Sequence, residues 1–162
     1  MIEGRAPLTL VVDNNVAVKW YIPQDFREQA LRVFYAGRDE EALLMAPALI
    51  YAEFGNALWR YHQAGELSLA EIREIWDDFE QTPLSFSAID LFIPRALEIA
   101  TSCGCTVYDA LYVALAVEGG EEGQEGAVAF TADRRLLRKL KGTHYEEFGM
   151  HIEDIGDFLP VS

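Results

Sequence analysis

Four acidic residues lie far apart in the sequence, and each stands where an apolar segment ends or turns into a helix. They are Asp13, Glu53, Asp109 and Asp133. An isolated carboxylate beside apolar sequence is costly to bury unless a cation pairs with it. Carboxylate oxygens that a fold gathers suit hard divalent ions such as Mg²⁺ or Mn²⁺. We therefore predict that these four residues are metal ligands and catalytic residues of a site that cleaves phosphodiesters.

Each of the four acids also has a purely structural explanation. Asp13 is suited to the turn after a strand, and Asp133 to the N-cap of the helix that follows it. Asp109 would gain from the helix dipole in the first turn of a helix. Glu53 is compatible with an ordinary helix position, although no basic residue stands three or four positions after it. The metal prediction therefore depends on the fold bringing the four carboxylates together.

Apolar runs of strand length alternate with segments of helical periodicity. Strands are predicted over 8–12, 42–46, 84–88 and 127–131, and helices over 16–21, 26–37, 47–65, 68–79, 91–103, 106–119 and from 133 onward. Asn14 and Asn15 are expected to cap the first helix, Pro47 to open the third, and 151–158 to form a final edge strand with a turn. This order predicts an α/β fold, a single-domain three-layer sandwich with a mainly parallel central sheet.

The sheet topology also predicts where a ligand would bind. In open α/β sheets, ligands lie outside the carboxyl ends of the strands, at the point where the strand order reverses. Asp13 and Asp133 both follow predicted strands, so both fall at that edge of the sheet.

The 162 residues correspond to one domain. Residues 1–5, Met-Ile-Glu-Gly-Arg, contain the recognition sequence of a protease used to remove tags, so we interpret them as a tag remnant and 6–162 as the domain. No apolar stretch approaches the roughly 20 residues of a membrane span, and no signal peptide is recognised. We expect a cytoplasmic protein that does not enter the membrane, with Cys103 and Cys105 as buried free thiols, since a disulfide between them would be strained.

The net charge of −14 argues against a protein that coats nucleic acid non-specifically. The charge is unevenly distributed along the chain. An acidic, glycine-rich stretch covers 118–126, and a basic run follows Asp133; the run comprises Arg134, Arg135, Arg138, Lys139 and Lys141. The basic run is compatible with a contact to phosphate or with a solvated helix face, and the acidic stretch with a flexible loop.

Four segments in this order resemble a PIN domain, and specifically a VapC-type toxin ribonuclease. They are VVDNNVAVKWYIP (11–23), APALIYAEFGNAL (46–58), TVYDALYVALA (106–116) and FTADRRL (130–136). The resemblance extends over nearly the whole chain. It implies a PIN-like fold, a Mg²⁺ or Mn²⁺ cofactor, an RNA substrate, a homodimer, and a VapB-type antitoxin that covers the site.

Carried over residue by residue, the resemblance makes Asp13, Glu53, Asp109 and Asp133 the metal-binding quartet. Thr131 matches a hydroxyl that supports the site, and Asn15 stands where the family often has Ser or Thr. Independently of the family, Lys19, Arg60, Arg134, Arg135 and Arg138 are candidate contacts to RNA phosphates.

Two other readings remain open. One is a non-catalytic PIN module that binds RNA or protein, for which an incomplete acidic set would be the sign. The other is a different acidic α/β domain, such as a receiver domain or a haloacid-dehalogenase-like phosphatase. The phosphatase requires a second Asp two positions after the first, where this chain has Asn15. The receiver requires clustered acids at its N-terminus and a lysine at the end of a late strand, and the chain has neither.

Overall fold

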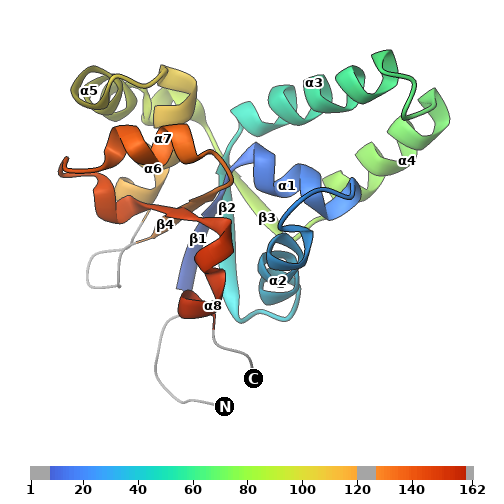
Figure 1. Ribbon diagram of the computed structural model, residues 1–162, viewed down its shortest axis with the longest axis horizontal. Coiled ribbons are helices and arrows are strands. Elements are labelled where there is room, and N and C mark those ends of the chain that lie inside the picture. The colour runs from blue at the N-terminus through green and yellow to red at the C-terminus, as the bar shows by residue number, and fades with distance from the viewer. Residues whose placement is uncertain (1–7, 120–126, 160–162) are drawn as a thin grey trace.

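The computed structural model describes residues 8–119 and 127–159. Residues 1–5, interpreted above as a tag remnant, and nearly all of the acidic stretch 118–126 lie outside these ranges. The described residues form one sheet with helices on both of its faces (Figure 1).

The sheet has five parallel strands in the order β3-β2-β1-β4-β5. Their bounds are Leu8–Val12 for β1, Ala42–Pro47 for β2, Leu84–Ser87 for β3, Val128–Thr131 for β4 and Gly149–His151 for β5. The central strand β1 is covered on both faces, since Leu10, Val11 and Val12 are fully buried. The predicted α/β sandwich is confirmed, and its sheet is entirely parallel.

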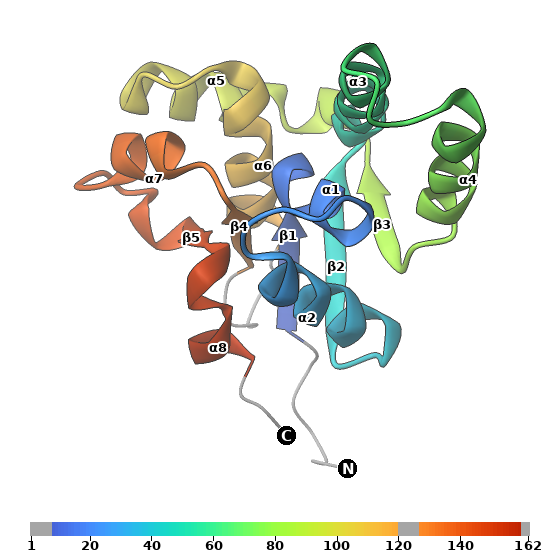
Figure 2. The same cartoon turned by 45° about the vertical axis from the view of Figure 1, so that its right-hand side comes forward.

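Two groups of helices cover the sheet (Figures 1 and 2). On one face, α6 (Val107–Glu118) packs against β1, β2 and β4, and α5 (Ile93–Cys103) packs against α6. On the other face lie α1 (Asn14–Tyr21) and α2 (Arg27–Arg38), with α3 (Leu49–Gln63) and α4 (Leu69–Glu80) beyond them. The short helix α7 (Arg134–Leu140) packs against β5, and α8 (Ile155–Phe158) packs against α2.

The helix α6 is apolar around nearly its whole circumference, and every residue from Ala110 to Ala116 is buried. A helix of this kind must be enclosed by protein on all sides. The sheet on one side and α5 on the other provide that enclosure. In the ranges that the structure describes, no single helix is long and apolar enough to span a membrane. The helices α5 and α6 meet the length and composition criteria only when taken together, and they are bent by 114° at their junction.

The predicted final edge strand over 151–158 is wrong in its position. The strand β5 ends at His151, and a 3-10 turn (Ile152–Asp154) and α8 follow it. Ile152 and Ile155 are both fully buried and are three residues apart, which is a helical spacing rather than the alternation of a strand. The His151 side chain accepts a hydrogen bond from the Glu153 amide and so begins the turn.

Three smaller expectations also differ from the structure. The N-cap of α1 is Asp13, so Asn14 and Asn15 lie inside the helix. Pro47 is the last residue of β2 and does not open the next helix, which starts at Leu49. Cys103 and Cys105 are free, as predicted, but both are partly exposed rather than buried.

Candidate active site

The candidate site lies at the carboxyl ends of β1 and β4. After β1 the chain continues to β2 on one side, whereas β4 pairs with β1 on the other, so the strand order reverses between them. Asp13 follows β1 directly, and its amide donates to the Phe130 carbonyl of β4 at 3.1 Å. The carboxylate of Asp13 therefore stands at the switch point, where such sheets bind ligands.

Two side chains hold the Asp13 carboxylate in place. The Thr131 hydroxyl donates to Asp13 Oδ2 at 2.7 Å, and Asn15 Nδ2 donates to the same oxygen at 3.2 Å. Both of these side-chain donors bond to Oδ2, and among the described residues no side chain donates to Oδ1. The carboxylate is thus fixed through one oxygen while the other remains available to a cation.

The Asn15 amide connects both ends of this small network. Its Nδ2 also lies 3.0 Å from the Thr131 hydroxyl, and its Oδ1 accepts from the Ala132 amide at 2.8 Å. The Thr131 hydroxyl accepts in addition from the Asp133 amide at 3.0 Å. The amide carries its donor and its acceptor on separate atoms, so Asn15 reaches Asp13 through Nδ2 and the Ala132 amide through Oδ1 at the same time.

Glu53 comes from α3 and is held by Tyr112 of α6. The Tyr112 hydroxyl donates a short hydrogen bond to Glu53 Oε2. Tyr112 is only 2% exposed, and burial together with the nearby charges of Asp13 and Glu53 raises its pKa. The hydroxyl therefore stays protonated and acts as a fixed donor to the glutamate.

The acids influence one another electrostatically. Burial, and then the charges of Glu53 and Asp109, raise the pKa of Asp13 to about 7, although the Thr131 hydrogen bond acts in the opposite direction. Burial and the charge of Asp109 also raise the pKa of Glu53, against the effect of the Tyr112 hydrogen bond. Asp13, Glu53 and Asp109 thus form one cluster of mutually repelling carboxylates, hereafter the acidic cluster.

Asp109 and Asp133 both lie at the N-terminal ends of helices, as their sequence context predicts. Thr106 is the N-cap of α6 and accepts from the Asp109 amide at 3.1 Å, which places Asp109 in the first turn. Asp133 is the N-cap of α7, and its Oδ1 accepts from the amides of Arg135 at 2.8 Å and Leu136 at 3.3 Å. The Asp133 carboxylate is therefore engaged in its own helix, and only its backbone is bonded to the Thr131 hydroxyl.

The chemistry of the donor set suits a hard divalent cation. All four predicted ligands offer carboxylate oxygens. The charges of Glu53 and Asp109 raise the pKa of Asp13, and the charge of Asp109 raises the pKa of Glu53, an unfavourable interaction that a bound cation would relieve. As the side chains stand, no group of three or more His, Cys, Asp or Glu residues within 8–119 and 127–159 is arranged to hold a metal ion. The residues fit the ion in kind and charge.

Two of the candidate phosphate contacts lie on α1 and α3. Lys19 is 6% exposed, and its Nζ donates to Gln24 Oε1 at 3.2 Å. Gln24 in turn donates to the Tyr61 hydroxyl at 2.7 Å, so the ammonium lies in a polar link between the helices. Arg60 is exposed on α3. Burial makes Lys19 the less accessible of the two, and the role of each residue stays a prediction.

The other candidate contacts lie on α7, on different faces of the helix. Arg134 pairs with Glu153 at 2.5 Å and, like Arg138, lines a groove between α7 and β5. Arg135 is exposed but does not line that groove. The basic run is therefore divided between two faces of a short helix.

Tyr112 is the site residue that the sequence analysis did not single out. It lies in a helix that is apolar almost throughout, where a tyrosine is readily interpreted as core. The available signal was its spacing, because Tyr112 stands three residues after Asp109 and so shares its helix face.

Comparisons with known proteins agree with this architecture. Residues 10–142, most of the chain, match the PIN domain. Ribonuclease VapC3 of Pyrobaculum aerophilum is 31% identical over 138 residues, which cover 82% of this chain and 95% of that protein. The crystal structure of PAE2754, also from Pyrobaculum aerophilum, matches with a TM-score of 0.59 at 22% identity over 95% of this chain and 90% of that one. At that identity the second likeness concerns the fold alone.

Proposed function

Because the chain belongs to the PIN-domain family and is homologous to a VapC ribonuclease, we propose that it is an endoribonuclease that depends on Mg²⁺ or Mn²⁺. The proposed substrate is RNA, and the proposed ligands of the ion are Asp13, Glu53, Asp109 and Asp133. The single observation that carries the proposal is the acidic cluster at the switch point of the sheet. Carboxylates that repel one another do not stabilise the fold, but they favour the binding of a cation.

The residues of the chain prepare the site for the ion. Thr131 and Asn15 both donate to Asp13 Oδ2, and Tyr112 donates to Glu53 Oε2. Each carboxylate is thereby oriented through one oxygen, and we assign the second oxygen, Oδ1 of Asp13 and Oε1 of Glu53, to the ion. Held carboxylates lose less entropy on binding a ligand than mobile ones.

When bound, a divalent ion would stabilise charge on the attacked phosphate and lower the pKa of a coordinated water. We assign to Asp109, whose charge acts on both Asp13 and Glu53, the acceptance of a hydrogen bond from the attacking water. Asp133 accepts from the Arg135 and Leu136 amides through Oδ1 alone, so we assign its Oδ2 to the ion.

The finer biological role rests on the homology. Ribonuclease VapC3 is named as a VapC protein, and we propose that this chain is likewise the toxin of a toxin–antitoxin pair, bound and inhibited by a VapB-type antitoxin. We also propose that it acts as a homodimer. Both statements can be tested on the purified protein by its mass in solution, alone and with the protein encoded beside it.

The first test is cleavage of RNA. Wild-type protein should cut at least one member of a panel of structured RNAs in the presence of Mg²⁺ or Mn²⁺, and EDTA should abolish the reaction. Asp109→Asn and Glu53→Gln should reduce the rate at least about 100-fold, since even partners of metal ligands contribute 10- to 100-fold. RNA binding without cleavage under every metal condition would favour the non-catalytic module instead.

A second test concerns Tyr112, which we assign as a positioning residue. Tyr112→Phe removes only the hydroxyl, so Glu53 should lose its donor and the affinity for Mn²⁺ should fall roughly 10-fold or more. Calorimetric titration with Mn²⁺ measures this directly. Tyr61→Phe is the matched control, because its hydroxyl is bonded to Gln24, outside the acidic cluster. Equal Mn²⁺ affinities in the two variants would show that Tyr112 has no role beyond packing.

A further inference from the structure

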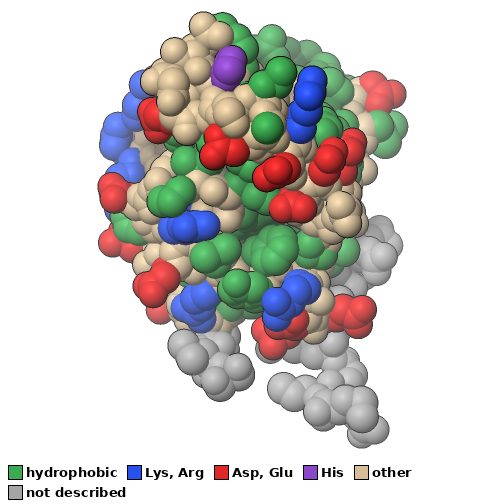
Figure 3. All heavy atoms as spheres, turned by 90° about the vertical axis from the view of Figure 1, so that its right-hand side faces the viewer, with side chains coloured by type: hydrophobic (Ala, Val, Ile, Leu, Met, Phe, Trp, Pro, Cys, Tyr) green, Lys and Arg blue, Asp and Glu red, His purple; other side chains and the backbone are tan. Residues whose placement is uncertain are grey.

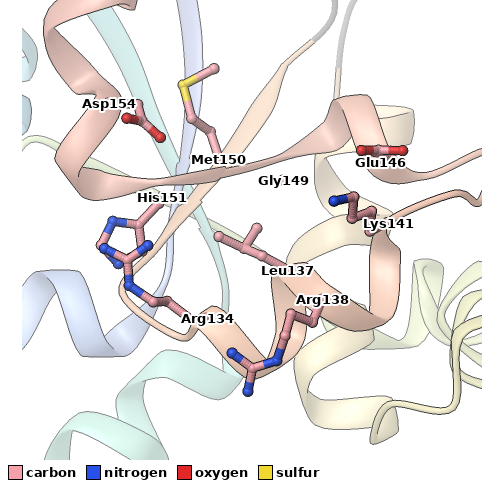
Figure 4. Close-up of a pocket in the computed structure, with 9 residues that line it drawn as sticks. All are labelled: Arg134, Leu137, Arg138, Lys141, Glu146, Gly149, Met150, His151 and Asp154. Carbon is pink, nitrogen blue, oxygen red and sulfur yellow. The ribbon is translucent and has the colours of Figure 1, made fainter.

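A groove of about 440 Å³ lies between α7 and the edge strand β5. Its lining includes Arg134, Leu137, Arg138 and Lys141 from α7 and its C-terminal end, and Gly149 and Met150 from β5. Figure 4 shows Arg134 beside His151 at one end, Lys141 and Glu146 at the other, and Leu137 and Gly149 between them. We call it the α7–β5 groove.

The cations of the groove form a stripe along one side of α7. Arg134, Arg138 and Lys141 are spaced by four and three residues, which places them on the same helix face. Arg135 and Lys139 are exposed but do not line the groove. The five basic residues of the run are thus sorted by the helix into a groove set and an outer set.

Only some of the groove cations are paired with acids among the described residues. Arg134 is paired with Glu153, and the Glu146 carboxylate accepts from the Gly142 amide at 2.7 Å. Arg138 and Lys141 make no ion pair with any residue of 8–119 or 127–159. Within the described ranges the groove therefore offers two cations without an ion pair, in a lining that also contains the carboxylates of Glu146 and Asp154.

The wall formed by β5 contributes His151, whose ring is only 4% exposed. Its Nδ1 accepts from the Glu153 amide, and the ring also interacts with the Ala132 backbone. The accessible cations of the groove are therefore those of α7 and its C-terminal end.

The position of the groove identifies its ligand. The helix α7 begins directly after Asp133 and runs away from the acidic cluster for about 10 Å, at 1.5 Å per residue. A strand cut at the acidic cluster would continue along this stripe. The face that includes α4 repels a polyanion instead: α4 carries Glu71, Glu74, Asp77, Asp78 and Glu80 against the single cation Arg73, and acidic side chains gather there (Figure 3).

We propose that the α7–β5 groove binds phosphates of the RNA strand that is cut at the acidic cluster, with Arg138 and Lys141 as the contacts. This inference rests on the proposed function and names the path of the substrate beyond the scissile bond. Within the basic run it assigns the phosphate contacts to Arg138 and Lys141, and it no longer assigns one to Arg135. Arg134 borders the path and is held at its place by Glu153.

The test compares two double variants of α7 that remove the same charge. Arg138→Gln with Lys141→Gln alters the groove set, and Arg135→Gln with Lys139→Gln alters the outer set. The probe is a labelled single-stranded oligoribonucleotide of mixed sequence, bound in EDTA at several salt concentrations. Two lost phosphate contacts should flatten the slope of log affinity against log salt by about 1.4 in the groove variant. The outer variant should keep the wild-type affinity and slope.

Three outcomes would overturn the inference. One is a groove variant with wild-type affinity and slope, and a second is an equal loss in both variants, which would indicate general charge attraction. The third is displacement of the oligoribonucleotide by inorganic phosphate at a concentration equal to that of the RNA nucleotides. The groove would then be a simple anion site. Metal-dependent cleavage is measured separately on the wild-type protein, so the proposed function can stand when this inference fails.

Discussion

Replacing Asp13 by Asn is expected to reduce RNA cleavage at least about 100-fold and, in EDTA, to make the protein more stable. The two effects have one cause. The pKa of Asp13 is raised to about 7 by burial and by the charges of Glu53 and Asp109. Above that pH the folded protein must carry an unfavourable charge, which costs on the order of 2 kcal/mol or more. An amide removes the charge, retains an oxygen that can accept from Thr131, and loses an anionic ligand.

The expected gain in stability corresponds to a thermal midpoint about 4–8 °C higher for a domain of this size. Differential scanning fluorimetry in EDTA above neutral pH measures it, and cleavage is followed on the same samples with Mg²⁺. Asp77→Asn, which alters an exposed acid on α4, is the matched control and should change neither quantity. Near-wild-type cleavage by Asp13→Asn would contradict the metal-nuclease proposal, whatever its stability.

The sequence predicted the fold well because its strands are buried on both faces. The apolar run 8–12 and the run before Asp133 had no amphipathic interpretation, so they indicated a covered parallel sheet. Once the sheet was parallel, the carboxyl ends of β1 and β4 had to meet at one edge, which placed Asp13 and Asp133 near the switch point. The final strand was misplaced because Ile152 and Ile155 serve a short helix.

The organisation of the candidate site was less accessible from the sequence. Neither the bond from Tyr112 to Glu53 nor the pairing of Asn15 with the loop after β4 depends on local spacing, since each joins segments distant in the chain. The sequence allowed Asp133 to be either a metal ligand or the N-cap of a helix. In the structure its side chain caps α7. The division of the basic run into two faces required the exact start of α7, which a pattern of charges does not define.

A divalent metal ion is expected to stabilise the protein, and the effect should grow as the pH rises. Without metal, Asp13 in the folded state holds its proton up to a pKa of about 7, whereas in the unfolded state it releases the proton near the ordinary aspartate pKa of 3.8. The folded state therefore binds more protons between about pH 4 and pH 7, and this residue lowers stability as the pH increases through that window.

Binding of Mg²⁺ or Mn²⁺ requires the ionised carboxylates, so protons compete with the ion at the low end of the window and not at the high end. At a metal concentration 100 times the dissociation constant, the gain is about 2.7 kcal/mol, or roughly 5–10 °C in the thermal midpoint. Midpoints measured in EDTA and in Mg²⁺ across this window should diverge as the pH rises. In Asp13→Asn the two curves should nearly coincide, because the ligand and its titration are both removed. Identical wild-type midpoints in EDTA and in a metal concentration that supports cleavage, above neutral pH, would contradict a site built on the acidic cluster.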